Sequence, residues 1–255
     1  MKSYIKPYIP LYNFPLKYCC VYSKYVYNIN NKISNNISNN INDDINIINT
    51  LINNNEKPNY NIILKYAING DKDSVVNLLK LKNKENKRVF DLSVELFNGA
   101  CSSGNIKLIK YLQEIGCEEN KYSILELIGN GYSKNIIKWG LDNLKYIKNN
   151  DLDILASGVG TGNLDIVKYL IKNNITAYES IYKSVHDIRM KDLEPVLAAC
   201  ELPLILFKPI IIYLSKCKFK CDSTVFFNII HDDEYTEKKN LLIKEFNIYI
   251  HHDYN

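Results

Sequence analysis

The sequence predicts an all-α protein, namely a solenoid of stacked helix-turn-helix repeats with irregular terminal caps. One amphipathic helical pattern returns along the chain at intervals of roughly 27 to 34 residues, which is the range of stacked helix-pair repeats. A second short helical stretch precedes most copies of this pattern. The predicted unit is therefore a helix, a tight turn, a second helix and a loop.

The clearest copy of the pattern spans 162–174 and reads G-N-L-D-I-V-K-Y-L-I-K-N-N. Its apolar residues recur at three- and four-residue steps, as on the buried face of a helix, and its polar residues fall on the opposite face. The apolar set is Leu164, Ile166, Val167, Leu170 and Ile171, and the polar set is Asp165, Lys168, Lys172 and Asn173.

Both ends of this segment suit a helix boundary. Gly162 allows a tight turn, and the Asn163 side chain can accept backbone N–H bonds as an N-cap. Asn173 and Asn174 can leave the helix through a left-handed conformation. The segment therefore predicts the limits of the helix as well as its buried face.

Further segments carry the same pattern, at 44–55, 70–79, 104–116 and 133–141, and more weakly at 192–200 and 236–246. Aligning them with the clearest copy predicts which residues face the core. These residues are Ile47, Ile48, Leu51, Ile52, Val75, Val76, Leu78, Leu79, Leu108, Ile109, Tyr111, Leu112, Ile136, Ile137, Trp139, Val196 and Ala199.

The preceding helical stretches are expected at 61–68, 95–101, 123–129, 153–159 and 179–188. Small residues stand in them where the following turn approaches, and small side chains let helices of neighbouring units pack closely. These small residues are Ala67, Ala100, Cys101 and Gly158.

This pattern predicts a division of the chain into three parts. Residues 44–201 form the repeat region, 1–43 an N-terminal cap with a low-complexity segment, and 202–255 degenerate repeats or a C-terminal cap. Isoleucines at four-residue steps in 28–43 leave a helical stripe and a solvated insert both open. The apolar run at 204–214 is too short to span a bilayer, so we expect a buried helix or a pair of turns and no membrane span.

Composition argues against a dedicated nucleic-acid binder and favours a reducing compartment. The formal net charge is only +4 over 255 residues. Lysine supplies nearly all the positive charge, whereas Arg88 and Arg189 are the only arginines, and arginine is the better reader of phosphates and bases. The seven cysteines are odd in number and irregularly spaced, and no secretory signal is evident, so we expect reduced thiols in the cytoplasm.

The sequence predicts no catalytic residue, no metal site and no cofactor. Cys217 and Cys221 have a spacing that zinc sites use, but zinc needs about four ligands, and the nearby histidines stand at no recognised spacing. The glycines at 158, 160 and 162 do not follow a strand of a βαβ unit, which argues against a phosphate loop. His186 on a helical stretch is expected to be structural, so acid, base and nucleophile do not cluster.

Two segments resemble the second half of ankyrin repeats. They read A-C-S-S-G-N-I-K-L-I-K-Y-L at 100–112 and G-T-G-N-L-D-I-V-K-Y-L-I at 160–171, with the turn glycine, the polar cap and the apolar positions in agreement. The T-P-L-H signature of the first half of ankyrin repeats is missing, so irregular helix pairs without regular β-turn fingers stay open. The bias toward Asn, Ile, Lys and Tyr is similar to that of ankyrin-repeat proteins of giant DNA viruses, which implies the host cytoplasm.

This architecture predicts a non-enzymatic scaffold that presents a concave surface to a partner protein of unknown identity. The resemblance leaves an alternative, a substrate adaptor that recruits a partner to ubiquitin-dependent degradation through 1–43 or 202–255. An enzyme is the third and least favoured class. Tyr and Arg are frequent interface anchors, and those near the inner-helix ends and preceding loops, together with one glutamate, are the expected partner-binding residues. They are Arg88, Tyr122, Tyr178, Glu179 and Tyr182.

Overall fold

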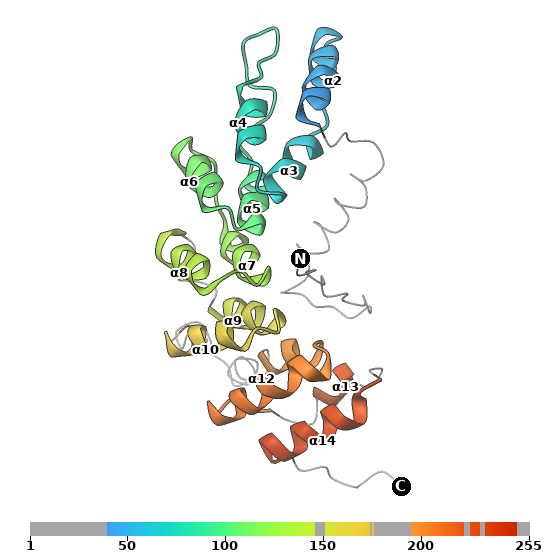
Figure 1. Ribbon diagram of the computed structural model, residues 1–255, viewed down its shortest axis with the longest axis vertical. Helices are drawn as coiled ribbons and strands as arrows, with labels where there is room; N and C mark the ends of the chain where they lie inside the picture. Colours follow the sequence, from blue (N-terminus) through green and yellow to red (C-terminus); the bar gives the residue numbers. More distant parts are fainter. Residues whose placement is uncertain are drawn as a thin grey trace, which may run out of the picture.

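Helix pairs follow one another along the long axis of the protein, from α2 at one end to α14 at the other (Figure 1). Within the described part of the chain the regular elements are α-helices, and β structure is limited to one isolated bridge between Lys82 and Arg88. The prediction of an all-α chain is confirmed for these residues. The computed structural model describes residues 40–145, 151–173, 175, 195–221, 225–229 and 233–248.

The first helices of successive pairs pack directly against each other and form the inside of the row. They match the stretches predicted at 61–68, 95–101, 123–129 and 153–159, whereas the stretch predicted at 179–188 lies outside the described residues. These helices are α3 (Asn61–Ile68), α5 (Val94–Ser103), α7 (Lys121–Gly129) and α9 (Asp151–Gly160).

Small residues bring these first helices close together, as the sequence predicts. Ala67, Ala100 and Cys101 are fully buried. A Cβ atom added at Gly99 of α5 would lie 3.3 Å from Cγ1 of Ile68 and 3.4 Å from Cβ of Ala67 on α3, and the first distance is tighter than an ordinary Cβ contact. Larger side chains at these positions would therefore separate the two units.

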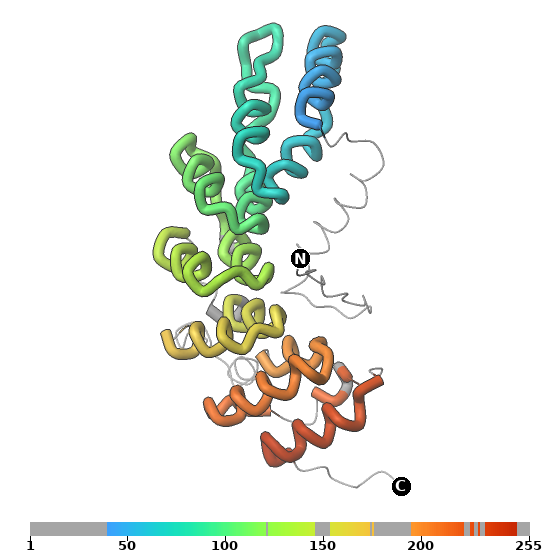
Figure 2. The backbone as a smooth tube through the Cα atoms, in the orientation of Figure 1, coloured from blue at the N-terminus to red at the C-terminus, as the bar shows by residue number. Residues whose placement is uncertain are grey.

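Each first helix packs against the second helix of its own pair, and the backbone reverses direction between the two (Figure 2). The reversal always uses a glycine with positive φ, a conformation that disfavours residues with a Cβ. These turn glycines are Gly70, Gly104, Gly131 and Gly162. The second helices are α4 (Lys72–Lys80), α6 (Ile106–Glu114), α8 (Lys134–Asn143) and α10 (Leu164–Lys172).

Asparagine caps begin two of the second helices. Asn163 accepts hydrogen bonds from the N–H groups of Asp165 and Ile166, which confirms the predicted cap of α10. Asn105 caps α6 in the same way and also donates its amide to the carbonyl of Gly70 at 2.7 Å, which ties one unit to the next.

The predicted left-handed exit from α10 is tested at one of its two positions. Asn173 is the C-cap with φ of −94°, so a left-handed residue, if present, is not Asn173. Its N–H instead bonds to carbonyls of the last helical turn, so the chain leaves α10 without a left-handed residue at that position. Asn174 lies outside the described residues.

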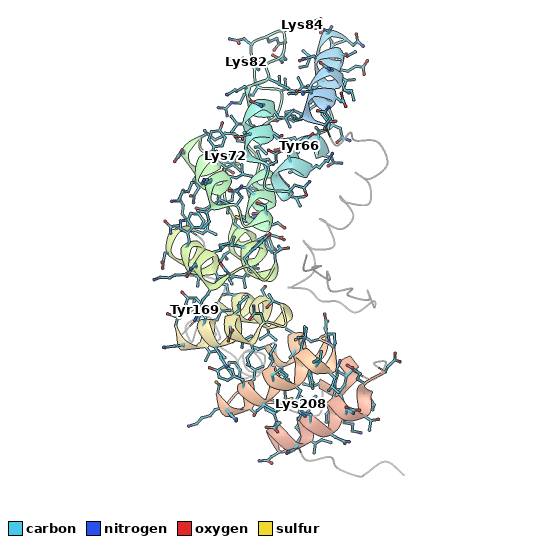
Figure 3. The ribbon with its side chains drawn as sticks, in the orientation of Figure 1. Tyr66, Lys72, Lys82, Lys84, Tyr169 and Lys208 are labelled. Carbon is cyan, nitrogen blue, oxygen red and sulfur yellow. The ribbon has the colours of Figure 1, made fainter. Side chains whose placement is uncertain are left out.

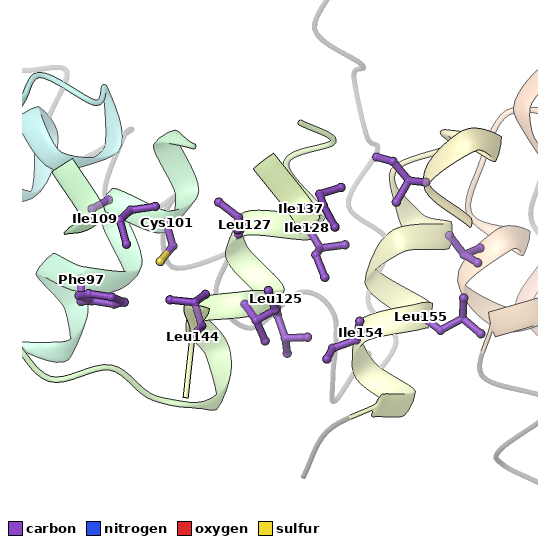
Figure 4. Close-up of a cluster of buried hydrophobic side chains, with 14 of the residues drawn as sticks. Phe97, Cys101, Ile109, Leu125, Leu127, Ile128, Ile137, Leu144, Ile154 and Leu155 are labelled. Carbon is purple, nitrogen blue, oxygen red and sulfur yellow. The ribbon is translucent and has the colours of Figure 1, made fainter. Parts of the chain in front are cut away.

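The predicted helix faces agree closely with the observed burial. In α10 the residues Ile166, Val167 and Leu170 are buried, whereas Lys168 is exposed. Corresponding residues of α4, α6 and α8 join the same continuous core, part of which is shown in Figure 4. The aromatic residues Tyr111 and Trp139 pack against this core but are only half-buried.

Three predicted core residues are wrong. Leu51 and Val76 are only half-buried and belong neither to the core nor to the side chains packed against it. The side chain of Ile47 is 48% exposed, although Ile48 beside it is fully buried. The helix α2 (Ile41–Asn53) begins before the predicted start at residue 44, and it packs through the face that carries Asp44 and Ile48. Asp44 accepts a 2.7 Å hydrogen bond from the hydroxyl of Tyr66 on α3, and this buried contact turns Ile47 away from the core.

The C-terminal part continues the row with longer helices. The weak copy at 192–200 predicts a second helix, but the helical residues 195–200 lead through a turn into α12 (Leu204–Lys216), and α12 packs against α10 in the position of a second helix. Val196 and Ala199 are buried as predicted. The row ends with α13 (Phe226–Ile229) and α14 (Tyr235–Phe246), and α14 packs against α12.

The apolar run at 204–214 is a single helix with Pro209 inside it, which agrees with the expectation of a buried helix. Its residues Phe207, Ile210, Ile211 and Leu214 are buried against the rest of the protein. Among the described residues, no helix has the length and apolar character required to cross a bilayer.

We expect Leu170→Ala to destabilise the protein by about 2–5 kcal/mol, because it leaves a cavity where a fully buried side chain stood. Lys168→Ala, on the exposed face of the same helix, should lower the free energy of unfolding by at most about 1 kcal/mol. Urea denaturation followed by circular dichroism measures both. Equal losses for the two variants would show that the faces of α10 are misassigned.

Gly104→Ala should destabilise the protein more than Gly116→Ala. Both glycines have positive φ, and an alanine in this conformation destabilises the protein by about 1–2 kcal/mol. A Cβ at Gly104 would in addition lie 2.7 Å from the ring of Tyr132, whereas nothing lies within 4 Å at Gly116. The resulting difference of about 1–3 kcal/mol should appear in thermal denaturation, and its absence would mean that Tyr132 does not hold the turn.

Candidate interaction surface

The last residue of α4 and the loop that follows it form a short antiparallel hairpin, which we call the finger and define as residues 80–89. Lys82 and Arg88 face each other in its one β-bridge. Backbone hydrogen bonds join Asn83 N–H to the Lys87 carbonyl at 2.9 Å and Val89 N–H to the Leu81 carbonyl at 3.1 Å. A β-turn finger is thus present here, although the first-half signature of ankyrin repeats is absent.

The tip of the finger is held by side-chain hydrogen bonds. The Asn83 side-chain oxygen accepts the N–H groups of Glu85 at 3.0 Å and Lys87 at 2.9 Å. Asn86 takes a left-handed φ of 62°, which Asn tolerates better than most residues with a side chain. The turn therefore has a defined conformation.

The finger is also fixed to its neighbours on both sides. The ammonium of Lys84 donates a 2.9 Å hydrogen bond to the carbonyl of Asn53 at the end of α2, where the helix dipole favours a cation. At the base, Phe90 is buried against the ring of Tyr60, with 6.0 Å between ring centroids. The Tyr60 hydroxyl donates a hydrogen bond to the Asp91 carbonyl and accepts one from the Ser93 hydroxyl.

The net positive charge of the whole protein equals the net charge of this finger. Five of the 32 basic residues and one of the 28 acidic residues lie in it, so the remaining 27 of each sign cancel. All five cations are exposed, and Figure 3 shows Lys82 and Lys84 at the outer end of the molecule. The cations are Lys80, Lys82, Lys84, Lys87 and Arg88.

The predicted partner-binding residues fall in different places. Arg88 is exposed in the finger, at the entrance to α5. Tyr122 begins α7 one unit later, where it is half-buried and packs against the core. Tyr178, Glu179 and Tyr182 lie outside the described residues, so the structure tests two of the five predicted positions for exposure only.

A row of lysine–aromatic pairs connects successive second helices, and the sequence reasoning did not predict it. In each pair a lysine ammonium lies over an aromatic ring of the following second helix, within 5.5 to 5.8 Å of the ring centroid. Each such contact contributes about 0.5–1 kcal/mol at an exposed site. The pairs are Lys72–Tyr111, Lys110–Trp139, Lys134–Tyr169 and Lys168–Tyr213.

The sequence reasoning also missed a polar cluster between α5 and α7, in which Ser102 and Glu126 are buried and Asn130 is exposed. Asn130 donates a 3.1 Å hydrogen bond to the hydroxyl oxygen of Ser102, and Tyr132 donates one of 2.7 Å to the Ser102 carbonyl. Glu126 is 9% exposed, and burial raises its pKa to about 7 although a hydrogen bond with Ser102 opposes the shift. The signal was a glutamate between apolar neighbours in S-I-L-E-L-I-G at 123–129.

Burial in this region favours the protonated, uncharged forms of the acidic groups, which argues against a reactive site there. Cys101 is fully buried nearby, and burial, with smaller contributions from Glu119 and Glu126, raises its pKa well above the usual range. Its thiol therefore stays protonated and is a poor nucleophile. In the described part of the chain, no group of three or more His, Cys, Asp or Glu residues is placed to hold a metal ion.

Comparisons with protein-family models, with curated proteins and with solved structures found no match to this chain.

Glu126→Gln should change the pH dependence of stability. The folded protein holds the Glu126 proton up to a pKa of about 7, whereas the ordinary value is 4.5, so wild-type stability should fall as the pH rises from about 4.5 to about 7. The amide keeps the shape without the charge, so it should raise stability at pH 8 by about 1–3 kcal/mol and have little effect at pH 5.

Denaturation at both pH values measures this effect. Glu114→Gln, an exposed position on α6, is the matched control and should leave the profile of the wild type unchanged. If the stability of the wild type and of Glu126→Gln changes equally between the two pH values, the raised pKa of Glu126 is contradicted.

Proposed function

We propose that the protein is a non-enzymatic scaffold for protein–protein interaction, built as an ankyrin-like solenoid. The observation that carries the proposal is the finger, a rigid hairpin that projects between two helix pairs and has a net charge equal to that of the whole protein. Fixed, exposed Arg and Lys groups on a preorganised loop are suited to recognition, because little ordering remains to be done on binding.

The repeating helix pairs support the same proposal. Their apolar side chains pack between units, so the stability of the row is a sum over neighbouring pairs. The turn glycines with positive φ recur at the same place in four pairs, which is the regularity that an ankyrin-like unit requires. Exposed positions on the loops and outer faces can then differ without disturbing the core.

In this proposal the partner binds at the loops that lead into the first helices. Arg88 lies in the loop that leads into α5, and Tyr122 lies in the first turn of α7, directly after the next loop of this kind. The sequence adds Tyr178, Glu179 and Tyr182 as residues of a later loop. The row of lysine–aromatic pairs lies on the second helices and gives the scaffold a second face with aromatic and cationic groups, both of which are common at interfaces.

We propose a cytoplasmic location, in the host cytoplasm if the protein is viral. The five cysteines among the described residues are free thiols, three of them buried, which suits a reducing compartment. The degradation-adaptor alternative would need a recruiting segment in 1–43 or 202–255. Because α12 and α14 pack as a continuation of the row, we assign residues 204–246 to the scaffold.

Affinity capture from native or infected cells with quantitative mass spectrometry tests the proposal. The double variant Arg88→Ala/Tyr122→Leu should lose partner proteins that the wild type retains, because it removes an exposed charge and a tyrosine hydroxyl while keeping apolar volume at 122. Lys107→Ala/Lys138→Ala, exposed on α6 and α8, is the matched control and should retain them. Retention of every partner by the Arg88/Tyr122 variant, or turnover of a substrate by the purified protein, would overturn the proposal.

A further inference from the structure

Two cations face each other directly at the centre of the finger. Lys82 and Arg88 are the bridge partners, and like charges on facing residues of antiparallel strands repel each other. Among the described residues, the ion pairs of the finger are limited to Lys87 with Glu85, so Lys82 and Arg88 have no carboxylate to offset the repulsion. This repulsion lowers the stability of the hairpin. A purely structural role of the hairpin therefore does not explain why Lys82 and Arg88 face each other.

The hairpin nevertheless holds these charges in place. Its turn is fixed by the Asn83 side chain, one flank by the bond from Lys84 to the end of α2, and its base by the buried Phe90. The cations therefore point outward from a rigid support. The electrostatic energy of these clustered cations becomes more favourable only when a negatively charged surface approaches.

We propose that the finger binds an acidic segment of the partner protein, whose Asp and Glu carboxylates neutralise Lys82, Arg88 and the neighbouring lysines. This inference rests on the proposed scaffold function and adds the chemical class of the partner. Charge complementarity carries it, since the finger has a net charge of +4, five cations against one carboxylate, whereas the rest of the chain has no net charge.

Protein carboxylates suit this surface better than a nucleic acid. Four of the five cations are lysines, which act as point charges, and Arg88 is the only guanidinium that could grip a phosphate with two bonds. The rest of the chain adds no net positive charge for a polyanion, and four of the lysines on the second helices already lie over aromatic rings.

The variant Lys82→Glu separates binding from folding. It replaces a repelling bridge pair with an attracting one, so the melting temperature should stay the same or rise. It should also weaken binding of a fluorescently labelled Glu-rich peptide at least about tenfold, because a like charge then meets the peptide. Lys107→Glu, the same charge change at an exposed site on α6, should bind the peptide like the wild type.

Fluorescence anisotropy at low and high salt measures the affinity, with a DNA duplex of matched charge as the competing probe. Wild-type binding should weaken as salt rises, and the duplex should bind more weakly than the peptide. Equal peptide binding by the wild type and Lys82→Glu, or tighter binding of the duplex, would overturn the inference. The two proposals can fail separately. If the Arg88/Tyr122 variant loses partner proteins while Lys82→Glu binds the peptide like the wild type, the scaffold function stands and only the proposal of an acidic partner is overturned.

Discussion

Burial of the apolar edge of each helix pair against the next pair is the constraint on which the structure depends. A single pair of short helices cannot hide its apolar residues alone, so α3, α5, α7 and α9 must lie against one another. The resulting core is one continuous cluster that runs through every described unit, and Figure 4 shows part of it. Loops and outer faces are left free for other purposes.

This constraint explains where the glycines, the small residues and the buried polar residues lie. Turn glycines and small residues such as Ala67 and Gly99 occur where two units approach most closely, because a larger side chain would separate them. Ser102 and Glu126 are buried between two first helices, where hydrogen bonds must replace water, and the exposed Asn130 bonds to Ser102 at the edge of this contact. The unbalanced charge instead lies on the finger, which contributes little apolar area to the core.

The two surfaces of the row have different chemistry. The second helices present lysines over aromatic rings, so charge and ring are paired within the protein and each contact also joins two units. The finger presents cations opposite each other with few partners. We infer that the first surface serves mainly cohesion and the second mainly recognition, because only unpaired charges retain most of their interaction energy for a ligand.

The helical periods, the turn glycines and the Asn163 cap could be predicted from the sequence, because each depends on residues close together in the chain. The sequence also singled out Arg88 as an exposed arginine before a helix. It did not predict the facing pair of Lys82 and Arg88, the lysine–aromatic row or the raised pKa of Glu126. These depend on which segments distant in the sequence become neighbours, and on how much water those neighbours exclude, and both are decided only when the helix pairs pack together.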